Sequence, residues 1–516
     1  MSMPNQDTGL TEFGYQNKLK RTLGGFHTFA AGISYISVLT GTFQLSYFGL
    51  SLGGPAYWWS WPLVFLGQLL VALSFAELAS RYPIAGSVYN WAKKLGGKHV
   101  GWLAGWMMLV ASIVSIAATA LAYQNTLPQI WAGFQIVGDG SSTTDQSVNG
   151  ILLALVLILF TTLVNAFGVK LMARINSAGV LLELVAAVLL IIALLFVVQN
   201  PPTVVLETSG TEANYGGSYL GAFLVAGIAS SYVMYGFDTA ASLGEESINP
   251  HRNAPKAILR ALIASAVLGG LIILLALMAI RDLDDPRLGE AGLQFVLGEA
   301  LGPVVGRLFL VAIFIAITVC VLAVHTAAIR IAFAMARDNA LPGGSKLAKV
   351  SPRFQTPVVP AIVIGVLAVA LLLVNVGQPQ IFTTVTSLAI ILIYISYLLV
   401  TIPMLVARLR GKWSSAKQPG RFSLGKFGLP VNILAVAWGL MMTINLAWPR
   451  REVYNAEPPY HWYLQYSSLL FVGIAALGGF AYYWFVLRHR VGVLADHAAK
   501  PSADESEQDE SATTVS

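Results

Sequence analysis

Charged residues and cysteine are both scarce in this sequence, and each shortage excludes a class of protein. Asp, Glu, Lys and Arg make up 11% of the 516 residues, whereas an ordinary soluble domain has about 25%. A water-soluble globule of this length could not cover its surface with so few charges. The single cysteine, Cys320, excludes an intrachain disulfide framework and a metal site built from several cysteines.

Long apolar runs are abundant. Apolar residues make up 56% of the chain and gather in runs of about twenty or more residues, the length at which a helix crosses a bilayer. We therefore predict an all-α membrane protein with twelve transmembrane helices. The predicted spans are residues 23–52, 57–79, 100–123, 149–168, 177–198, 217–243, 256–280, 303–327, 357–376, 381–407, 428–448 and 462–487.

The positions of the basic residues predict the orientation. If the amino terminus is cytoplasmic, all but five of the 31 Lys and Arg residues lie on the cytoplasmic side, as the positive-inside rule expects. The five on the other side are Arg281, Arg287, Arg307, Arg450 and Arg451. Both termini are then cytoplasmic, in a cell membrane (plasma or inner membrane). The formal charge of +6 reflects this asymmetry, so we expect the lipid bilayer as a partner and no nucleic acid.

The chain divides into two five-helix blocks with additions. Residues 21–200 hold spans 1 to 5, residues 215–407 hold spans 6 to 10, and residues 428–487 add two helices. We expect residues 1–20 and 491–516 to be disordered cytoplasmic ends, the second of them acidic, because they lack an apolar period. Between spans 7 and 8, apolar residues at helical spacing predict a short amphipathic helix: Leu293, Val296, Leu297 and Leu301.

Spans 1 and 6 are interrupted. A Gly flanked by β-branched and small polar residues occurs in Ser37–Thr42 of span 1 and in Tyr235–Thr239 of span 6. Inside a membrane, unwound backbone must line a cavity or be packed in protein. Since the two spans open successive blocks, the paired breaks predict a midplane substrate site in an inverted-repeat transporter. The half-helix beginning near Thr42 would present N–H groups to an anion, and the one ending near Met234 would present carbonyls to a cation.

Three motifs resemble those of a transporter family. Motifs similar to those of amino acid–polyamine–organocation (APC) superfamily permeases occur, in order, at Glu77–Tyr89, at Tyr235–Asp238 followed by Gly244–Pro250 and Pro255, and at Ala336–Pro342. The resemblance implies a five-plus-five inverted-repeat (LeuT-like) fold with broken helices 1 and 6 and two extra helices. It also implies a secondary active transporter (permease) that imports an amino acid or a related amine by alternating access.

The resemblance further implies where the substrate binds. Backbone from Ser37 to Thr42 would face a substrate carboxylate, carbonyls near Ile36 and Tyr235 would face its amino group, and Phe237 would cover the site. The substrate-binding residues so predicted are Ile36, Ser37, Thr40, Gly41, Thr42, Met234, Tyr235, Gly236, Phe237 and Asp238. The break in span 1 has a single Gly and looks more like the branch that carries 4-aminobutyrate, choline, ethanolamine and other amines. Such a break leaves fewer backbone amides for an α-carboxylate.

Three acidic residues lie within predicted spans, where a charge is costly. Glu77 lies one turn from Arg81 and is interpreted as part of a structural ion pair with it. Asp238 directly precedes the second half of span 6. It is interpreted first as a helix N-cap, and second as a contact for a substrate ammonium group.

The third acid, Glu183, lies deep in an uninterrupted apolar helix. Its position is similar to one where some relatives carry a lysine in place of a sodium ion. Removing a carboxylate from water favours its protonated form, so Glu183 could load and release a proton during transport. We interpret Glu183 first as the carrier of a coupling proton. A buried structural acid and a cation site, for instance for sodium, are the alternatives.

His325 and Thr326 are polar residues deep in span 8. A lone intramembrane histidine is more often a hydrogen-bonded core residue, and the alternative is a place in the proton path with Glu183. The remaining histidines lack the spacing of metal ligands, so neither a metal nor a cofactor is expected.

Other functional classes fit the sequence less well. A channel needs a continuous polar pore lining, and these spans hold very few ionisable groups. An enzyme needs a nucleophile–base pair or a metal cluster, and no such set is visible, so catalytic residues are not expected. An amino acid or amine exchanger, and a transporter-like nutrient sensor, stay open as alternatives to proton symport.

Overall fold

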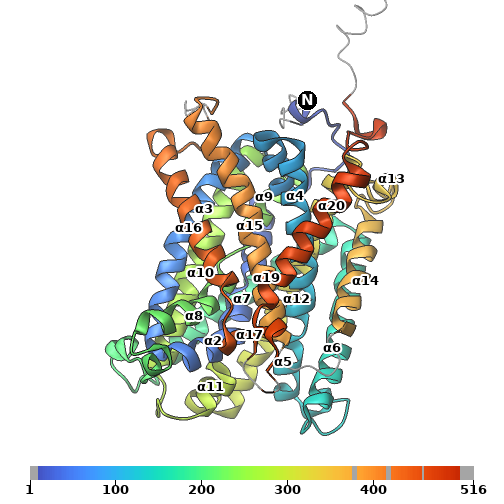
Figure 1. Ribbon diagram of the computed structural model, residues 1–516. Helices are drawn as coiled ribbons and strands as arrows, with labels where there is room; N and C mark the ends of the chain where they lie inside the picture. Colours follow the sequence, from blue (N-terminus) through green and yellow to red (C-terminus); the bar gives the residue numbers. More distant parts are fainter. Residues whose placement is uncertain (1–9, 375–380, 414–419, 456–457, 459, 500–516) are drawn as a thin grey trace, which may run out of the picture.

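The computed structural model is a bundle of helices (Figure 1), and it describes residues 10–374, 381–413, 420–455, 458 and 460–499. Within these residues the only β-structure is two isolated bridges, between Tyr15 and Ala498 and between Leu23 and Ser247. The predicted all-α class is therefore confirmed.

The described chain contains twenty α-helices. The first ten α-helices are α1 (Gly25–Ile36), α2 (Val38–Gly53), α3 (Ser60–Arg81), α4 (Ser87–Ala120), α5 (Ala122–Ile130), α6 (Thr143–Phe167), α7 (Val169–Leu195), α8 (Tyr219–Val233), α9 (Thr239–Ser242) and α10 (Pro250–Met278). The others are α11 (Arg287–Ala291), α12 (Leu293–Arg337), α13 (Gly344–Leu347), α14 (Val358–Val374), α15 (Ile381–Leu409), α16 (Gly428–Ala447), α17 (Arg451–Tyr454), α18 (Trp462–Gln465), α19 (Ser467–Gly473) and α20 (Gly479–Tyr482). Two short π-helices, Ile474–Gly478 and Tyr483–Leu487, continue α19 and α20.

Nine helical stretches of the described chain are long and apolar enough to cross a membrane, or ten if the bent pair Pro202–Tyr215 and Tyr219–Val233 forms one span. All twelve predicted apolar runs contain helix. Three of these runs hold no single helix long enough to cross a membrane. The first run is broken into α1 and α2, and the helices of the sixth and ninth runs, α8 and α14, are short. The chain is a multi-pass membrane protein, and its count of twelve spans stays a prediction.

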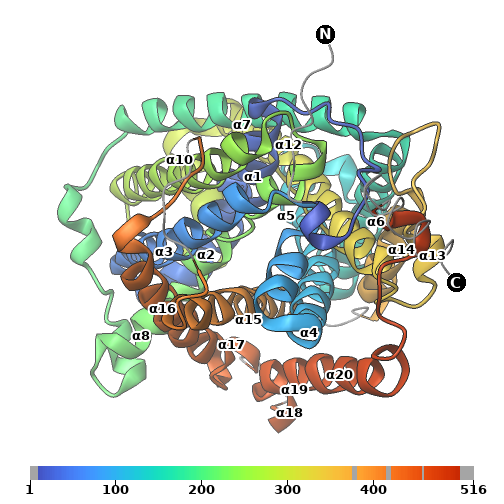
Figure 2. The same cartoon turned by 90° about the horizontal axis from the view of Figure 1, so that it is seen from above.

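The two halves of the first broken span, α1 and α2, lie inside the bundle. Helix α1 packs against α7, α10 and α12, and α2 packs against α8, α10 and α12. Seen from above, α7 and the α18–α20 segment run along opposite edges of the molecule (Figure 2). These edges expose large apolar side chains such as Leu181, Phe196 and Phe485, which is the surface expected of a protein surrounded by lipid tails.

Helix α12 contains the short helix predicted before span 8. Gly302 has a non-helical conformation (φ 76°, ψ 170°) and divides α12 into a short first part and a long second part. In the first part, the side chains of Leu293, Val296 and Leu297 are buried against the bundle. The predicted amphipathic helix is therefore present, and a Gly with positive φ ends it.

The two ends of the described chain lie together on one face, called here the terminal face. The Gln16 N–H donates to the His497 carbonyl, and the Ala499 N–H donates to the Gly14 carbonyl, both at 2.9 Å. Tyr15 is buried beneath this contact. The predicted disorder of residues 1–20 and 491–516 is therefore wrong for residues 10–20 and 491–499, because terminal backbone finds hydrogen-bond partners there. The rest of both segments lies outside the described residues.

Glu77 has a different partner from the predicted one. Its carboxylate forms a buried ion pair with Arg408 of α15, while the Arg81 guanidinium lies over the Trp413 ring, 4.1 Å from its centroid. The prediction of a Glu77–Arg81 pair is wrong. The one-turn spacing made that pair possible, but helix packing brought another guanidinium to the carboxylate.

Candidate functional site

The break in the first span is a single residue. Helix α1 ends at Ile36, Ser37 has a left-handed backbone (φ 41°, ψ 87°), and α2 begins at Val38. The predicted break over Ser37–Thr42 is therefore too long, and the prediction that the second half-helix begins near Thr42 is wrong. One left-handed residue interrupts the hydrogen-bond ladder, and the β-branched residues after it are compatible with helix when packed in protein.

Glu183 reaches this break from α7. Its Oε1 atom accepts a hydrogen bond from the Leu39 N–H at 3.2 Å and lies 3.0 Å from the Ser37 hydroxyl. The Ser37 hydroxyl is also 2.6 Å from the Thr40 hydroxyl. Glu183 is only 4% exposed, and α7 is continuous around it. The prediction of a buried acid in an unbroken helix is confirmed, and the structure adds that this acid contacts the amino end of α2.

The break in the second interrupted span is longer. Helix α8 ends at Val233, residues 234–238 are not helical, and α9 begins at Thr239. Gly236 has φ 84°, a conformation that side chains other than that of Gly rarely adopt. A Cβ atom at Gly236 would also overlap the Tyr35 ring of α1. Gly236 therefore permits both the turn and the close contact between the two broken helices.

Tyr397 of α15 holds the second break. The Gly236 N–H donates to its Oη atom at 3.0 Å, and the Tyr397 hydroxyl donates to Asp238 Oδ1 at 2.5 Å. The side chain of Asp238 makes no capping hydrogen bond, and its backbone is helical rather than extended. The predicted N-cap position of Asp238 is therefore confirmed, but its side chain does not cap α9, because a residue with helical backbone does not aim its side chain at the first N–H groups of the helix.

Aromatic rings surround the two breaks. The Tyr35 and Tyr235 ring centroids are 5.8 Å apart, and both rings are buried. Phe237 is completely buried; its ring packs edge-on against Phe75, with centroids 6.1 Å apart, and in a tilted contact against Tyr397, with centroids 5.5 Å apart. The contact between Tyr35 and Tyr235 brings the two predicted breaks together, although 200 residues separate them in the chain.

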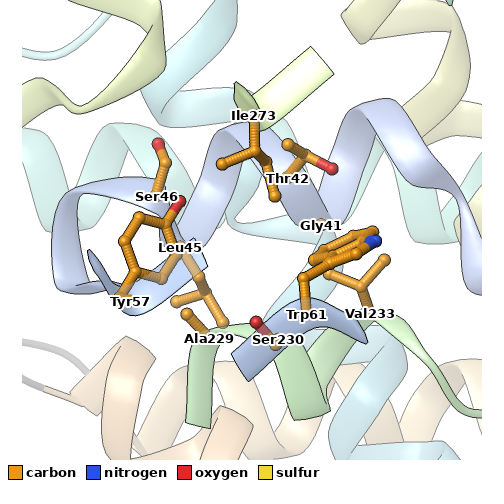
Figure 3. Close-up of a pocket in the computed structure, with 10 residues that line it drawn as sticks. All are labelled: Gly41, Thr42, Leu45, Ser46, Tyr57, Trp61, Ala229, Ser230, Val233 and Ile273. Carbon is orange, nitrogen blue, oxygen red and sulfur yellow. The ribbon is translucent and has the colours of Figure 1, made fainter. Parts of the chain in front are cut away.

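A small cavity lies next to the breaks, on the side away from the terminal face. It holds about 180 Å³ of empty space, including its open side, between α2, α3, α8 and α10 (Figure 3). Its lining residues are Gly41, Thr42, Leu45, Ser46, Tyr57, Trp61, Ala229, Ser230, Val233 and Ile273. A Cβ atom at Gly41 would lie 2.6 Å from the Val233 side chain, so Gly41 permits the close packing of α2 and α8. The Thr42 hydroxyl is buried and makes no hydrogen bond to a described residue.

His325 and Thr326 contact other elements. The two His325 ring nitrogens lie 3.1 Å from the Thr161 hydroxyl and 3.0 Å from the Ala361 carbonyl, and the Thr326 hydroxyl donates to Asn165 Oδ1 at 2.8 Å. Within the described chain, no hydrogen bond joins either residue to Glu183. The three predicted coupling residues therefore form two groups, one at the break in the first span and one between α12, α6 and α14.

Buried ion pairs lie between the breaks and the terminal face. Glu245 pairs with Arg337 at 2.9 Å and Glu246 pairs with Arg330 at 3.0 Å. All four side chains are 1% exposed. The sequence contains these residues in or near the family-like motifs but does not indicate which charges meet. Their pairing joins the loop after α9 to the end of α12.

Tyr15 and Asp338 extend this network to the chain ends. The Tyr15 hydroxyl donates to Asp338 at 2.8 Å, and Lys93 pairs with the same carboxylate at 2.5 Å. Burial raises the pKa of Tyr15 well above its ordinary value, so the hydroxyl keeps its proton and acts as a donor. Sequence reasoning missed Tyr15 and Tyr397, since a single Tyr near an apolar run has the same sequence signature as an interfacial anchor.

The site offers both hydrogen-bond donors and hydrogen-bond acceptors. Helix α2 begins with N–H groups suited to an anion, whereas α1 and α8 end with carbonyls suited to a cation. One carboxylate lies at each break, Glu183 at the first and Asp238 at the second. Such a site can bind a small molecule that carries an amino group, with or without a carboxylate.

Comparison with known proteins points to one family. A family model described as amino acid permease matches residues 23–475. The chain is 28% identical over 513 residues to the amino-acid permease BAT1 of Arabidopsis thaliana, across 94% of this chain and 96% of the relative. It is 27% identical over 451 residues to the branched-chain amino acid permease BcaP of Bacillus subtilis, across 84% and 90% of the two chains. It is also 29% identical over 393 residues to the methylthioribose transporter of Bacillus subtilis, across 72% and 81%.

Proposed function

The chain belongs to the amino acid permease family, and we propose that it is a secondary active transporter that imports an amino acid or a related amine by proton symport. The observation that carries this proposal is the contact between two broken helices, with a buried carboxylate beside each break. Unwound backbone is tolerated in a membrane where it lines a binding site. The membrane would be the plasma or inner membrane, with both termini cytoplasmic and a five-plus-five inverted repeat of twelve helices.

The proposed substrate lies between the two breaks. Its amino group would meet the carbonyls at the ends of α1 and α8, near Ile36 and Tyr235, and the carboxylate of Asp238. A carboxylate, where the substrate has one, would meet the first N–H groups of α2, including that of Thr40, which precede the first bond of the helical ladder. The breaks favour amino acids and carboxylate-free amines such as choline or ethanolamine as candidates, and the named substrates of the bacterial relatives extend the list to branched-chain amino acids and methylthioribose.

The proposed proton carrier is Glu183. It is the acid that touches the break in the first span, so a change in its charge acts directly on the helix that contacts the substrate. His325 has hydrogen-bond partners at both ring nitrogens, and these partners lie on α6 and in α14. We therefore assign His325 and Thr326 to the packing of these helices, and the coupling role to Glu183.

Uptake into proteoliposomes tests the proposal. The purified full-length protein would be reconstituted and given radiolabelled leucine, 4-aminobutyrate, choline and ethanolamine, with an inward pH gradient, an inward sodium gradient or no gradient. We expect at least one of these substrates to accumulate above its outside concentration only with the pH gradient. Accumulation with sodium at constant pH would indicate a sodium symporter. Uptake that requires an internal amino acid would indicate an exchanger, and binding without uptake would indicate a sensor.

A further inference from the structure

The amino end of α2 already holds a carboxyl group, that of Glu183. The N–H groups of Val38, Leu39 and Thr40 precede the first bond of the helical ladder, which runs from the Gly41 N–H to the Ser37 carbonyl at 3.0 Å. The Leu39 N–H donates to Glu183 at 3.2 Å. Helix α2 has 16 residues, long enough for its aligned peptide dipoles to give this end a partial positive charge. The carboxylate of Glu183 therefore lies where the N–H groups and the dipole of α2 would stabilise a substrate carboxylate most strongly.

No cation neutralises Glu183 within the described chain. Its Oε2 atom is buried and has no hydrogen-bond partner there. The titratable group that faces it from the neighbouring helices is the Cys320 thiol of α12. Helices α1, α6 and α10 also pack against α7 but place no charged side chain beside this carboxylate. An ionised Glu183 therefore depends on the amino end of α2 and on the Ser37 hydroxyl for its stabilisation.

We propose that the ionised carboxylate of Glu183 and the carboxylate of a substrate compete for the amino end of α2. The transporter then accepts a carboxylate-bearing substrate only when Glu183 is protonated. A carboxylate-free amine does not enter this competition and binds with Glu183 in either state. This inference rests on the proposed function, and it names the chemical feature of the substrate that links transport to the proton.

The physical reason is electrostatic. Two carboxylates near one helix terminus repel each other in a medium of low dielectric constant, and the partial charge of one helix end cannot compensate both. A proton taken from solution by Glu183 converts its carboxylate to a neutral carboxylic acid. The N–H groups of α2 are then free to bind the substrate carboxylate. The proton and the substrate carboxylate therefore bind together, which is the linkage that symport requires.

Matched ligand pairs test this competition. Binding to the purified full-length protein in lipid nanodiscs would be measured from pH 5.5 to 8 for leucine and 3-methylbutylamine, and for 4-aminobutyrate and propylamine. The two members of each pair differ by the carboxylate alone. We expect the dissociation constant of the carboxylate-bearing member to rise by up to about tenfold per pH unit in the upper part of the range, while that of the amine stays within about twofold. An equal pH dependence for both members, or none for either, would overturn the inference.

Two variants locate the effect. In Glu183→Gln the side chain stays neutral, so the carboxylate-bearing ligand should bind equally well at every pH. In Ser37→Ala the ionised Glu183 loses a hydrogen-bond donor, so the pH dependence of binding of the carboxylate-bearing ligand should shift to higher pH. If Glu183→Gln does not fold, this shift tests the competition by itself. Asp282→Asn, which removes an exposed carboxylate far from the breaks, should behave as wild type. An unchanged profile in the Glu183 and Ser37 variants would contradict the competition, whereas absence of binding for all four ligands at every pH would contradict the proposed function itself.

Discussion

The two breaks satisfy their unwound backbone in different ways. The first is one residue long and uses a carboxylate from another helix, since Glu183 of α7 contacts Ser37 and the start of α2. The second is five residues long, carries its own carboxylate and is held by the hydroxyl of Tyr397. The carboxylate at the first break is held by a backbone N–H and a serine hydroxyl at the start of α2, whereas the carboxylate at the second is held by a tyrosine hydroxyl that also accepts a hydrogen bond from a backbone N–H. The comparison supports the proposal that the first break couples transport to the proton, and it suggests that the second break mainly fixes the shape of the site.

The largest loss of uptake is expected when a large side chain replaces a glycine at or beside either break. Gly236→Leu must adopt a positive φ and overlap the Tyr35 ring, and Gly41→Leu must displace Val233. Each should lower uptake by at least about 100-fold, because crowding and strain of several kcal/mol act on the proposed site. Uptake would be measured at equal membrane abundance. Gly298→Leu, at a position where a Cβ atom meets nothing within 4 Å, should keep near-normal uptake. Wild-type uptake in both site variants would remove this site from consideration.

A change of charge at the first break should separate coupling from binding. Glu183→Gln keeps the shape of the side chain but cannot exchange a proton, so uptake driven by a pH gradient should fall by about tenfold or more. Counterflow at constant pH, which needs no net proton movement, should survive. Undiminished pH-driven accumulation by this variant would show that Glu183 is a structural acid.

Loss of the hydroxyl at the second break should affect binding and coupling alike. Tyr397→Phe leaves the Gly236 N–H and the Asp238 carboxylate without their partner, at a cost of about 1–3 kcal/mol. We expect a loss of about tenfold in uptake and in counterflow together. Tyr394→Phe is a matched control, because that hydroxyl lies on the same helix and is buried without a hydrogen bond to either break. A variant that loses pH-driven uptake alone would contradict the assignment of shape to this break.

A smaller effect is expected from the ring beside the second break. If Phe237 covers a substrate ammonium, Phe237→Leu removes a cation–π contribution of about 1 kcal/mol and should weaken apparent affinity about fivefold. The loss should be nearly equal for all good substrates in a competition panel. Phe333→Leu changes a similarly buried ring near the terminal face and serves as the control. Unchanged affinity in Phe237→Leu would show that this ring only packs against Phe75 and Tyr397.

The smallest effect on coupling is expected at His325. His325→Gln changes a ring whose two nitrogens contact Thr161 and Ala361, so its loss should lower stability and membrane abundance by breaking buried hydrogen bonds. The ratio of pH-driven uptake to counterflow should stay within about twofold of wild type. A selective loss of pH-driven uptake would return His325 to the proton path.

The sequence predicted those features that depend on residues adjacent in the chain: the helices, their interruptions and the burial of Glu183. Helices form over the apolar runs because each satisfies its backbone internally, and the interruptions at Ser37 and Gly236 are visible as small residues within such runs. The buried position of Glu183 followed from its apolar neighbours in the chain. The length of the first break did not, because Thr40 and Thr42 are acceptable in a helix once α8 and α10 pack against it.

Partnerships between distant residues were decided by the tertiary structure. By itself the sequence determined the class of protein, the approximate position of each helix, the two breaks and the family. Only the fold decided that Glu183 meets Leu39, that Tyr397 holds Asp238 and that Arg408, rather than Arg81, pairs with Glu77. A buried polar group must find a partner somewhere, and local sequence shows that this need exists. Which partner meets it depends on which helices lie side by side, and that depends on packing across the whole bundle.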